Sequence, residues 1–321
     1  MDPSRPTRSS TSRRKPSGSS RRSRGGSSTS ASRGESPTGA AANTSAGLGA
    51  GAIRDLAARY DIRPRKSLGQ NFLIDPNVAR AIAADAGLVP GDRVVEIGAG
   101  LGSLTVALAA TGAEVLAIES DRKVVGALEE VVGDLQNVRV VRADVMKEGW
   151  GNELHGRQWV MCANLPYGIA VPLVLDTLDG LPVVTRFVIT VQREVGERLA
   201  ALPGDEQYGA ASVRVAYHAT AKILRRVSAS VFWPRPKVES VVVGLERLGS
   251  APVAVDPDRL WRVVTAGFAE RRKTMRNALR RLGLDPVAAV ELMAACGLPA
   301  NARAEELGLD AFASIAEALP S

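Results

Sequence analysis

The sequence has few of the residues that hold metals or disulfides. Its two cysteines, Cys162 and Cys296, lie far apart, and its two histidines, His155 and His218, show no metal-ligand spacing. These counts argue against a zinc site or a disulfide scaffold and favour a reducing compartment. No apolar run approaches the roughly 20 residues that a membrane-spanning helix needs, and the N-terminus lacks the apolar core of a signal peptide. We therefore expect a soluble, cytoplasmic protein with no metal and no membrane partner.

Positive charge is abundant but unevenly distributed. The formal net charge is +7, and nine of the 41 basic but only two of the 34 acidic residues fall within residues 1–50. The rest of the chain is therefore neutral overall, and a nucleic-acid surface on it must come from local clusters. Residues 1–50 are dominated by Ser, Arg, Gly, Thr and Pro, which predicts a disordered tail. Such a tail fits an RNA-binding arm, a solubilising extension or an organelle transit peptide.

Strand-like and helix-like segments alternate along the middle of the chain. Strands are predicted at 93–97, 114–119, 138–141, 159–163, 186–191, 211–218 and 238–245. With helices between them, they indicate an α/β, Rossmann-like domain over residues 51–250, which would bind ligands at the carboxyl ends of its strands. Beyond residue 256 only helical spacing remains. One long apolar stripe from Trp261 to Leu282 predicts a helix within a small all-helical domain, residues 256–321.

A glycine turn directly follows the first of these strands. Gly98, Gly100 and Gly102 stand at alternate positions, where they allow close approach of a ligand and expose amides at a helix N-terminus. A dinucleotide fingerprint would need its third glycine at position 103, which is Ser103. The spacing instead favours a turn of the S-adenosylmethionine type, with the methionine end of the ligand near Gly98 and Gly100.

Polar side chains close the next three strands. Glu119 is placed to accept hydrogen bonds from ribose hydroxyls, and Asp144 from an adenine amino group. Either carboxylate by itself would also fit a solvated strand end, but the ordered series favours a cofactor site. The following motif, Asn164-Leu165-Pro166-Tyr167, combines an amide, a free carbonyl and an aromatic ring, which suits the binding of a planar nitrogen base. The simpler alternatives are core packing for Tyr167 and a strand terminator for Pro166.

Five motifs occur in the order and spacing of a known family. They are Gly69-Gln70-Asn71-Phe72-Leu73, Glu96-Ile97-Gly98-Ala99-Gly100, Asn164-Leu165-Pro166-Tyr167, Phe232-Trp233-Pro234-Arg235-Pro236-Lys237-Val238 and Arg271-Arg272-Lys273-Thr274-Met275-Arg276. Over roughly residues 53–318 the chain resembles the bacterial small-subunit ribosomal RNA adenine-N6,N6-dimethyltransferases. Where this family often has Asn after the tyrosine, Gly168 stands here.

The resemblance implies a class I methyltransferase that uses S-adenosylmethionine to methylate N6 of two adjacent adenosines twice each. The substrate would be the 3′ region of small-subunit RNA in an assembling 30S particle, with the enzyme acting as a monomer. By motif position, the cofactor would contact Asn71, Leu73, Gly98, Gly100, Glu119, Asp144 and Asn164. The target base would be held by Asn164, Leu165, Pro166 and Tyr167, and Phe232 would stack on its other face.

The strongest basic cluster lies in the last of these motifs and just beyond it. Its members are Arg271, Arg272, Lys273, Arg276, Arg280 and Arg281, and no acidic residue lies between Arg271 and Leu284. We expect this cluster to bind RNA phosphates, although a charge run is also typical of a solvated helix face. Arg63, Arg65, Lys66, Arg235 and Lys237 are weaker candidates.

Two other functions fit parts of the pattern. One is a large-subunit adenine-N6 methyltransferase of the macrolide-resistance type, which shares the fold and a similar base-holding motif. The other is a non-catalytic assembly or transcription factor. The segment from Phe232 to Val238 and the basic helical region favour the small-subunit enzyme, and a complete set of pocket residues argues against a protein without turnover.

Overall fold

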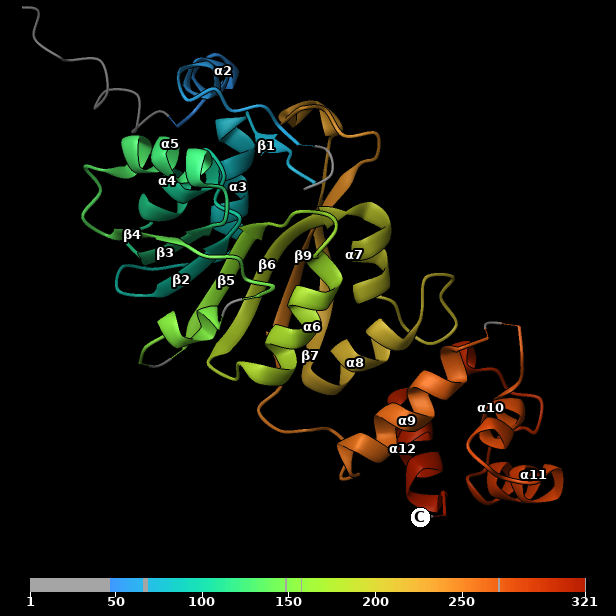
Figure 1. The fold of residues 1–321 in the computed structure, drawn as a ribbon. Coiled ribbons are helices and arrows are strands. Elements are labelled where there is room, and N and C mark those ends of the chain that lie inside the picture. Colours follow the sequence, from blue (N-terminus) through green and yellow to red (C-terminus); the bar gives the residue numbers. More distant parts are fainter. Residues whose placement is uncertain (1–46, 66–68, 148, 157, 271, 321) are drawn as a thin grey trace, which may run out of the picture. The chain divides into compact units, whose positions relative to one another are not determined.

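The fold is built on a mixed sheet covered by helices. The computed structural model describes residues 47–65, 69–147, 149–156, 158–270 and 272–320. They include a seven-stranded sheet of order β4-β3-β2-β5-β6-β9-β7 (Figure 1). In that order the strands are β4 (Val138–Arg142), β3 (Glu114–Glu119), β2 (Arg93–Ile97), β5 (Trp159–Asn164), β6 (Val184–Gln192), β9 (Ser240–Arg247) and β7 (Ala219–Val227). The expected α/β architecture is confirmed.

The strand order creates a crevice at the carboxyl ends of the parallel strands. Strands β4, β3, β2, β5 and β6 run parallel, and β9 pairs antiparallel with both β6 and β7. The chain proceeds from β2 to β3 on one side, but β5 lies on the other side of β2. The order therefore reverses between β2 and β5, where the loops at the carboxyl ends diverge and leave room for a ligand.

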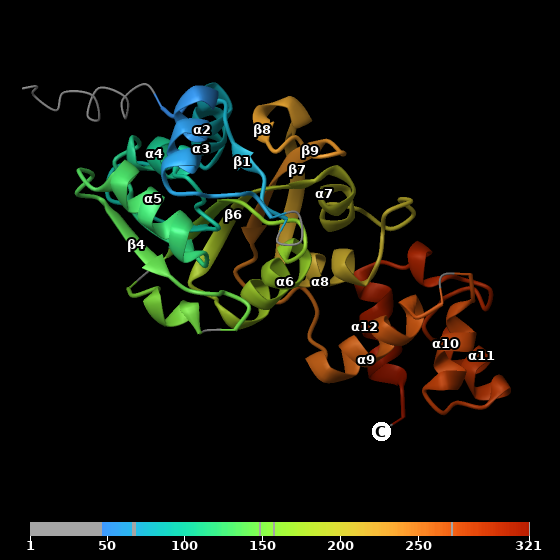
Figure 2. The same ribbon diagram turned by 45° about the horizontal axis from the view of Figure 1, so that its top comes forward.

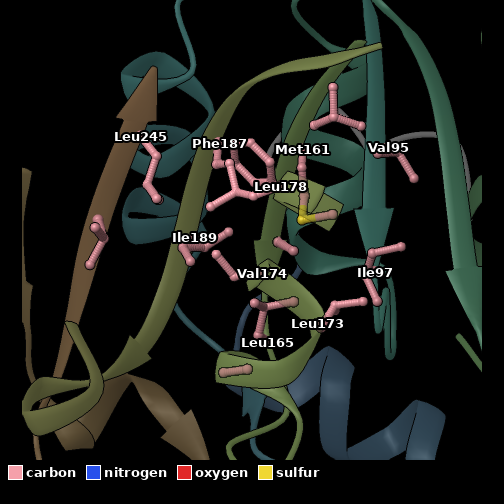
Figure 3. Packing of buried hydrophobic residues seen from close by; sticks show 14 of the residues in the cluster. Val95, Ile97, Met161, Leu165, Leu173, Val174, Leu178, Phe187, Ile189 and Leu245 are labelled. Atoms are coloured by element: carbon pink, nitrogen blue, oxygen red, sulfur yellow. The ribbon is translucent and has the colours of Figure 1, made fainter. Parts of the chain in front are cut away.

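Helices cover both faces of the sheet. They are α3 (Pro76–Asp85), α4 (Ser103–Ala109), α5 (Arg122–Val132), α6 (Ala170–Gly180), α7 (Arg193–Leu199) and α8 (Ala210–His218), whereas α2 (Ala50–Arg59) packs on α5 in a core of its own. On one face Val94 and Cys162 share a core with α3 and α4. On the other face Val95 and Met161 share a core with α6 (Figure 3). Because successive strand side chains point to opposite faces, burial on both faces requires the nearly continuous apolar runs of β2 and β5.

A short sheet joins two segments that are far apart in the sequence. Strand β1 (Phe72–Leu73) pairs antiparallel with β8 (Phe232–Trp233). Before β1, Leu48 is only 7% exposed and α2 begins at Ala50, so ordered packing is already present just before the expected boundary at residue 51. The rest of the predicted tail, residues 1–46, lies outside the described residues.

The prediction of a strand at residues 211–218 was wrong. This segment is helix α8, and the strand follows it as β7. Val213 and Val215 are both buried, which imitates the alternation of a strand, but they belong to different cores. Val213 packs with the C-terminal helices and Val215 with the sheet. A helix that lies between two cores can bury side chains on more than one side.

The long C-terminal helix expected from Trp261 to Leu282 is two helices. They are α9 (Pro257–Phe268) and α10 (Met275–Arg281). The Met275 amide donates to the Ala302 carbonyl at 2.8 Å, and Thr274 forms a bridge with Arg303. These contacts with a distant segment replace the hydrogen bonds that a continuous helix would need. The helix is therefore interrupted between α9 and α10.

The C-terminal helices share a core. Helices α9 and α10 pack with α11 (Pro286–Ala295) and α12 (Leu309–Ala318) (Figure 2). This core also takes in Tyr208, whose hydroxyl donates to the Leu307 carbonyl at 2.9 Å. A separate domain from residue 256 therefore remains a prediction. No helix in the described part of the chain is long and apolar enough to cross a membrane.

Candidate active site

A cavity of about 310 Å³ lies at the carboxyl ends of β2, β3 and β5. Its walls come from segments 69–73, 96–100, 103–104, 118–120, 143–146 and 164–167, with Ile169. Every residue expected to contact the cofactor lines it, namely Asn71, Leu73, Gly98, Gly100, Glu119, Asp144 and Asn164. Leu165, Pro166 and Tyr167 line the same cavity. The fold thus brings together segments that are almost 100 positions apart in the sequence.

The glycine turn makes room for this cavity. Gly98 and Gly100 have φ values of +72° and +58°, and each is closely packed. A Cβ on Gly98 would lie 3.2 Å from Pro166 Cδ, and a Cβ on Gly100 would lie 3.0 Å from the Phe72 ring. Side chains at these positions would strain the backbone and crowd the cavity wall.

The first three amides of the turn are already hydrogen-bonded within the protein, whereas the N-terminus of α4 has no side-chain cap. The Gly98 and Ala99 amides donate to the Ile118 carbonyl at 2.8 and 3.2 Å, and the Gly100 amide donates to Glu119 Oε2 at 3.0 Å. These bonds join the turn to β3. Residues 98–100 therefore contribute space and a fixed backbone to the cavity.

Glu119 is held from both sides by main-chain donors. Besides the Gly100 amide on Oε2, the Ser120 and Asp121 amides donate to Oε1 at 2.8 and 3.0 Å. The residue is 8% exposed and lines the cavity. Because each carboxylate oxygen can accept more than one hydrogen bond, Glu119 can still accept from ligand hydroxyls in an orientation set by the protein.

Asp144 supplies a second carboxylate at the next strand end. Lys147 Nζ donates to its Oδ2 at 2.7 Å, and the Met146 amide donates to Oδ1 at 3.1 Å. The hydrogen bond from Lys147 and then that from Met146 lower the pKa of Asp144. Asp144 is thus an ionised hydrogen-bond acceptor at neutral pH.

Asn164 ends β5 with its side chain anchored. Its Nδ2 donates to the Asn71 carbonyl at 3.0 Å, and Asn71 Nδ2 donates to the Gly69 carbonyl at 3.0 Å. The first bond identifies which end of the Asn164 amide is nitrogen, so Oδ1 remains an acceptor at the cavity. The Leu165 amide donates to the Thr190 carbonyl at 3.1 Å, which ties the following residue to β6.

Of the two aromatic rings expected to contact the target base, only Tyr167 lies at the cavity. Tyr167 lines the cavity, and its hydroxyl lies 3.0 Å from Ser240 Oγ. Burial raises the pKa of Tyr167, and the Ser240 contact partly opposes this. The expectation for Phe232 was wrong for this structure, because its side chain is 2% exposed and does not line the cavity. It packs in the sheet core, in register with Leu73 through the β1–β8 pairing, and has no ring face available for stacking.

Sequence reasoning did not assign a role to Glu96, which also lines the cavity. It is 1% exposed, and Thr105 Oγ1 donates to its Oε2 at 2.6 Å. Burial raises the pKa of Glu96 to about 8; the Thr105 hydrogen bond opposes this shift and the negative charge of Glu119 adds to it. A charged residue inside an otherwise apolar strand was the available signal. Groups of three or more side chains able to hold a metal are absent from the described residues.

The basic cluster is only partly free. Arg272, Lys273, Arg276 and Arg280 are exposed and make no ion pair with any described residue. Arg281 instead pairs with Glu270 and donates to the Ala266 carbonyl at 2.9 Å. Arg271 lies outside the described residues. Glu270 lies just before the acid-free run, so the sequence pattern did not reveal this partner.

Comparisons with known proteins agree on one family. The model of the family described as ribosomal RNA adenine dimethylase matches residues 62–320. A relative from Thermobifida fusca, named ribosomal RNA small subunit methyltransferase A, is 42% identical over 274 residues, covering 84% of this chain and 94% of the relative. A relative of the same name from Moorella thermoacetica is 42% identical over 266 residues, covering 80% of this chain and 92% of the relative.

Solved structures agree on the fold. A dimethyladenosine transferase from Plasmodium falciparum aligns with a TM-score of 0.66 at 23% identity, covering 76% of this chain and 95% of that one. The 23S rRNA methyltransferase ErmE aligns with a TM-score of 0.62 at 22% identity, covering 78% and 99%. The described sheet thus has the Rossmann-like fold of these methyltransferases.

Proposed function

The chain belongs to the ribosomal RNA adenine dimethylase family, and we propose that the cavity at the ends of β2, β3 and β5 holds both the cofactor and the target adenine. The enzyme is an S-adenosylmethionine-dependent ribosomal RNA adenine dimethyltransferase. Its substrate is N6 of two adjacent adenosines near the 3′ end of the small-subunit RNA, within an assembling 30S particle. The names of the relatives support the small subunit.

The residues of the cavity fit S-adenosylmethionine. Gly98 and Gly100 leave space where a Cβ would crowd Pro166 and Phe72. Glu119 accepts hydrogen bonds from the ribose hydroxyls and Asp144 from the adenine amino group, while Asn71 and Leu73 line the wall. When bound, the cofactor supplies a methyl group activated by a sulfonium.

Positioning of the adenine amine is the main task of the protein. The N6 lone pair is delocalised into the ring, so the amine is a weak nucleophile. Asn164 Oδ1 and the Leu165 carbonyl accept its two N–H groups and favour a pyramidal nitrogen as the new bond forms. Tyr167 stacks on the base and offsets the stacking that the base loses when it leaves the RNA helix.

The hydrogen bond from Asn164 to Asn71 carries this proposal. It occupies the amide nitrogen and leaves the oxygen as an acceptor at the cavity. Once the nitrogen has four substituents it is acidic, so its proton can pass to solvent without a strong base. This agrees with a site built from an amide and a carbonyl.

Exposed basic side chains bring the RNA to this site. Arg272, Lys273, Arg276 and Arg280 extend from the segment before α10 into that helix. They bind phosphates and carry no information about base sequence. Arg281 acts mainly within the protein, through Glu270.

Mass spectrometry of ribosomal RNA tests the proposal. Small-subunit RNA from cells with the gene should contain dimethyladenosine near the 3′ end, and RNA from cells without it should not. The purified enzyme should restore the modification on small subunits from the deleted strain. Preferential methylation of naked large-subunit RNA would favour the ErmE-like alternative, and failure to bind S-adenosylmethionine would favour a non-catalytic factor.

A further inference from the structure

Tyr167 is held at two points that lie far apart in the sequence. Its main chain is closely covered by Gly69, because a Cβ on Gly69 would lie 3.0 Å from the Tyr167 nitrogen. Its hydroxyl lies 3.0 Å from Ser240 Oγ, where either group can donate. The Tyr167 side chain is therefore held at its main chain by Gly69 and at its hydroxyl by Ser240.

Ser240 is a rigid anchor. It is the first residue of β9, is 0% exposed, and pairs with Gln192 of β6 and Val227 of β7. A residue whose main chain is paired on both sides has little freedom to follow a moving loop. Its hydroxyl consequently sets where the far end of the Tyr167 ring lies.

The two methylations of one adenosine place different demands on this ring. In each transfer, the N6 lone pair forms the bond to the methyl carbon. The bond from that carbon to the cofactor sulfur breaks, its electron pair stays on sulfur, and an N6 proton then passes to solvent. Unmethylated N6 offers two N–H groups to Asn164 Oδ1 and the Leu165 carbonyl. Monomethylated N6 offers only one.

One directional contact is therefore lost before the second transfer. Alignment of the reacting nitrogen then depends more on the ring that stacks on the base. An unanchored ring should still support the first transfer, which has both hydrogen bonds, better than the second.

We propose that Ser240 is a positioning residue that acts through the Tyr167 hydroxyl and serves mainly the second methylation of each adenosine. This inference rests on the proposed function of the cavity. It assigns to β9, which contributes no residue to the cavity wall, a part in determining that the product is dimethylated.

The ratio of monomethyladenosine to dimethyladenosine tests this role. Purified wild-type enzyme, Ser240→Ala, Tyr167→Phe and the double variant act on small subunits from cells that lack the gene, and digested RNA is analysed by mass spectrometry over time. We expect each single variant to lower the rate of the second methylation about fivefold relative to the first, the effect of losing one hydrogen bond. The double variant should match the single variants, because both substitutions remove the same contact.

Ser212→Ala is the matched control. Ser212 is 2% exposed and donates a hydrogen bond to the Arg198 carbonyl at 2.6 Å, but it does not line the cavity. It should affect stability and leave the product ratio unchanged. Tyr167→Phe removes only the hydroxyl, so it tests the contact even if Ser240→Ala folds poorly.

A wild-type ratio in Tyr167→Phe, or an equal loss of both methylations in the variants, would overturn the role of Ser240. Absence of dimethyladenosine with the wild-type enzyme would instead reject the proposed function itself.

Discussion

The side-chain nitrogen of Asn164 donates a hydrogen bond to the main-chain carbonyl of Asn71 at 3.0 Å. This contact joins the carboxyl end of β5 to the segment that precedes β1. It fixes the rotation of the Asn164 amide, because a flipped amide would place two oxygens against each other. The Asn164 side-chain oxygen, the proposed acceptor for the target base, is thus oriented by the protein itself.

Asn164→Ala should retain most cofactor affinity and lower methyl transfer by about 10²–10³-fold, as for the loss of one preorganised polar group. Calorimetry with S-adenosylmethionine and single-turnover methylation measure the two effects. Asn137→Ala is a control, because that amide donates to the Ala109 and Ala113 carbonyls and does not line the cavity. Turnover near that of the wild type in Asn164→Ala would contradict the assignment.

Glu119→Ala should weaken cofactor binding and also destabilise the protein. The variant removes the proposed ribose acceptor and leaves the Gly100, Ser120 and Asp121 amides without their partner. Loss of such bonds costs about 1–3 kcal/mol in unfolding free energy. Calorimetry and urea denaturation measure affinity and stability separately. Unchanged affinity in the folded variant would exclude the ribose role.

Stability should fall as pH rises from about 4.5 to about 8 because of Glu96. Its pKa is 4.5 in the unfolded reference and about 8 in the folded protein, so the folded state binds the proton more tightly. The stabilising contribution is complete below pH 4.5 and is lost as pH approaches 8. Glu96→Gln, a neutral mimic, should lack this component in denaturation curves at pH 5, 6.5 and 8.

The control for that pH dependence is Glu291→Gln, an exposed carboxylate of α11. This variant should keep the wild-type slope of stability against pH. An equal slope in Glu96→Gln and the wild type would show that Glu96 does not carry the effect.

The double substitution of Arg276 and Arg280 by Ala should weaken RNA binding at all sequences. Each removed phosphate contact should reduce the slope of log affinity against log salt by about 1. Arg281→Ala is the matched comparison, because the Arg281 guanidinium already pairs with Glu270 and donates to the Ala266 carbonyl. We expect it to lower the melting temperature and leave the salt slope near that of the wild type. A reduced salt slope in Arg281→Ala, with a wild-type slope in the double variant, would show that Arg281 rather than Arg276 and Arg280 contacts RNA phosphates.

Two buried threonines should respond oppositely to replacement by valine. Thr190 Oγ1 is buried without a hydrogen-bond partner among the described residues, whereas Thr177 Oγ1 donates to the Leu173 carbonyl at 2.6 Å. Thr190→Val should raise the unfolding free energy by about 1 kcal/mol, and Thr177→Val should lower it by about 0.5–1 kcal/mol. Chemical denaturation measures both. Destabilisation by Thr190→Val would show that this hydroxyl has a partner.

Local pattern was sufficient for the framework of the site. Strands β2, β3 and β5 are apolar because they are buried on both faces, and the residues after them line one cavity. The positive φ angles of Gly98 and Gly100 explain why glycine is needed there. These features were predictable because strand period, turn chemistry and the edge shared by parallel strands depend on short segments.

Where a segment has two neighbours, local pattern misled. The burial of Val213 and Val215 resembles that of a strand because α8 contacts two cores. The sequence of α9 and α10 resembles one helix because only the fold brings the Ala302 carbonyl to the Met275 amide. Phe232 looked like an exposed stacking ring, yet its pairing with Leu73 buries it. In each case the deciding partner is distant in sequence.

The sequence by itself determined the class of fold, the order of polar groups along the cavity edge and the family resemblance, because these depend on residue type and spacing. Only the tertiary structure decided which groups remain available for chemistry. In the fold, the Asn164 side-chain nitrogen donates to the Asn71 carbonyl, and Arg281 pairs with Glu270. Burial raises the pKa of Glu96, and Ser240 lies beside the Tyr167 hydroxyl. Hydrogen bonding and desolvation act between atoms in contact, and those contacts exist only once the chain is folded.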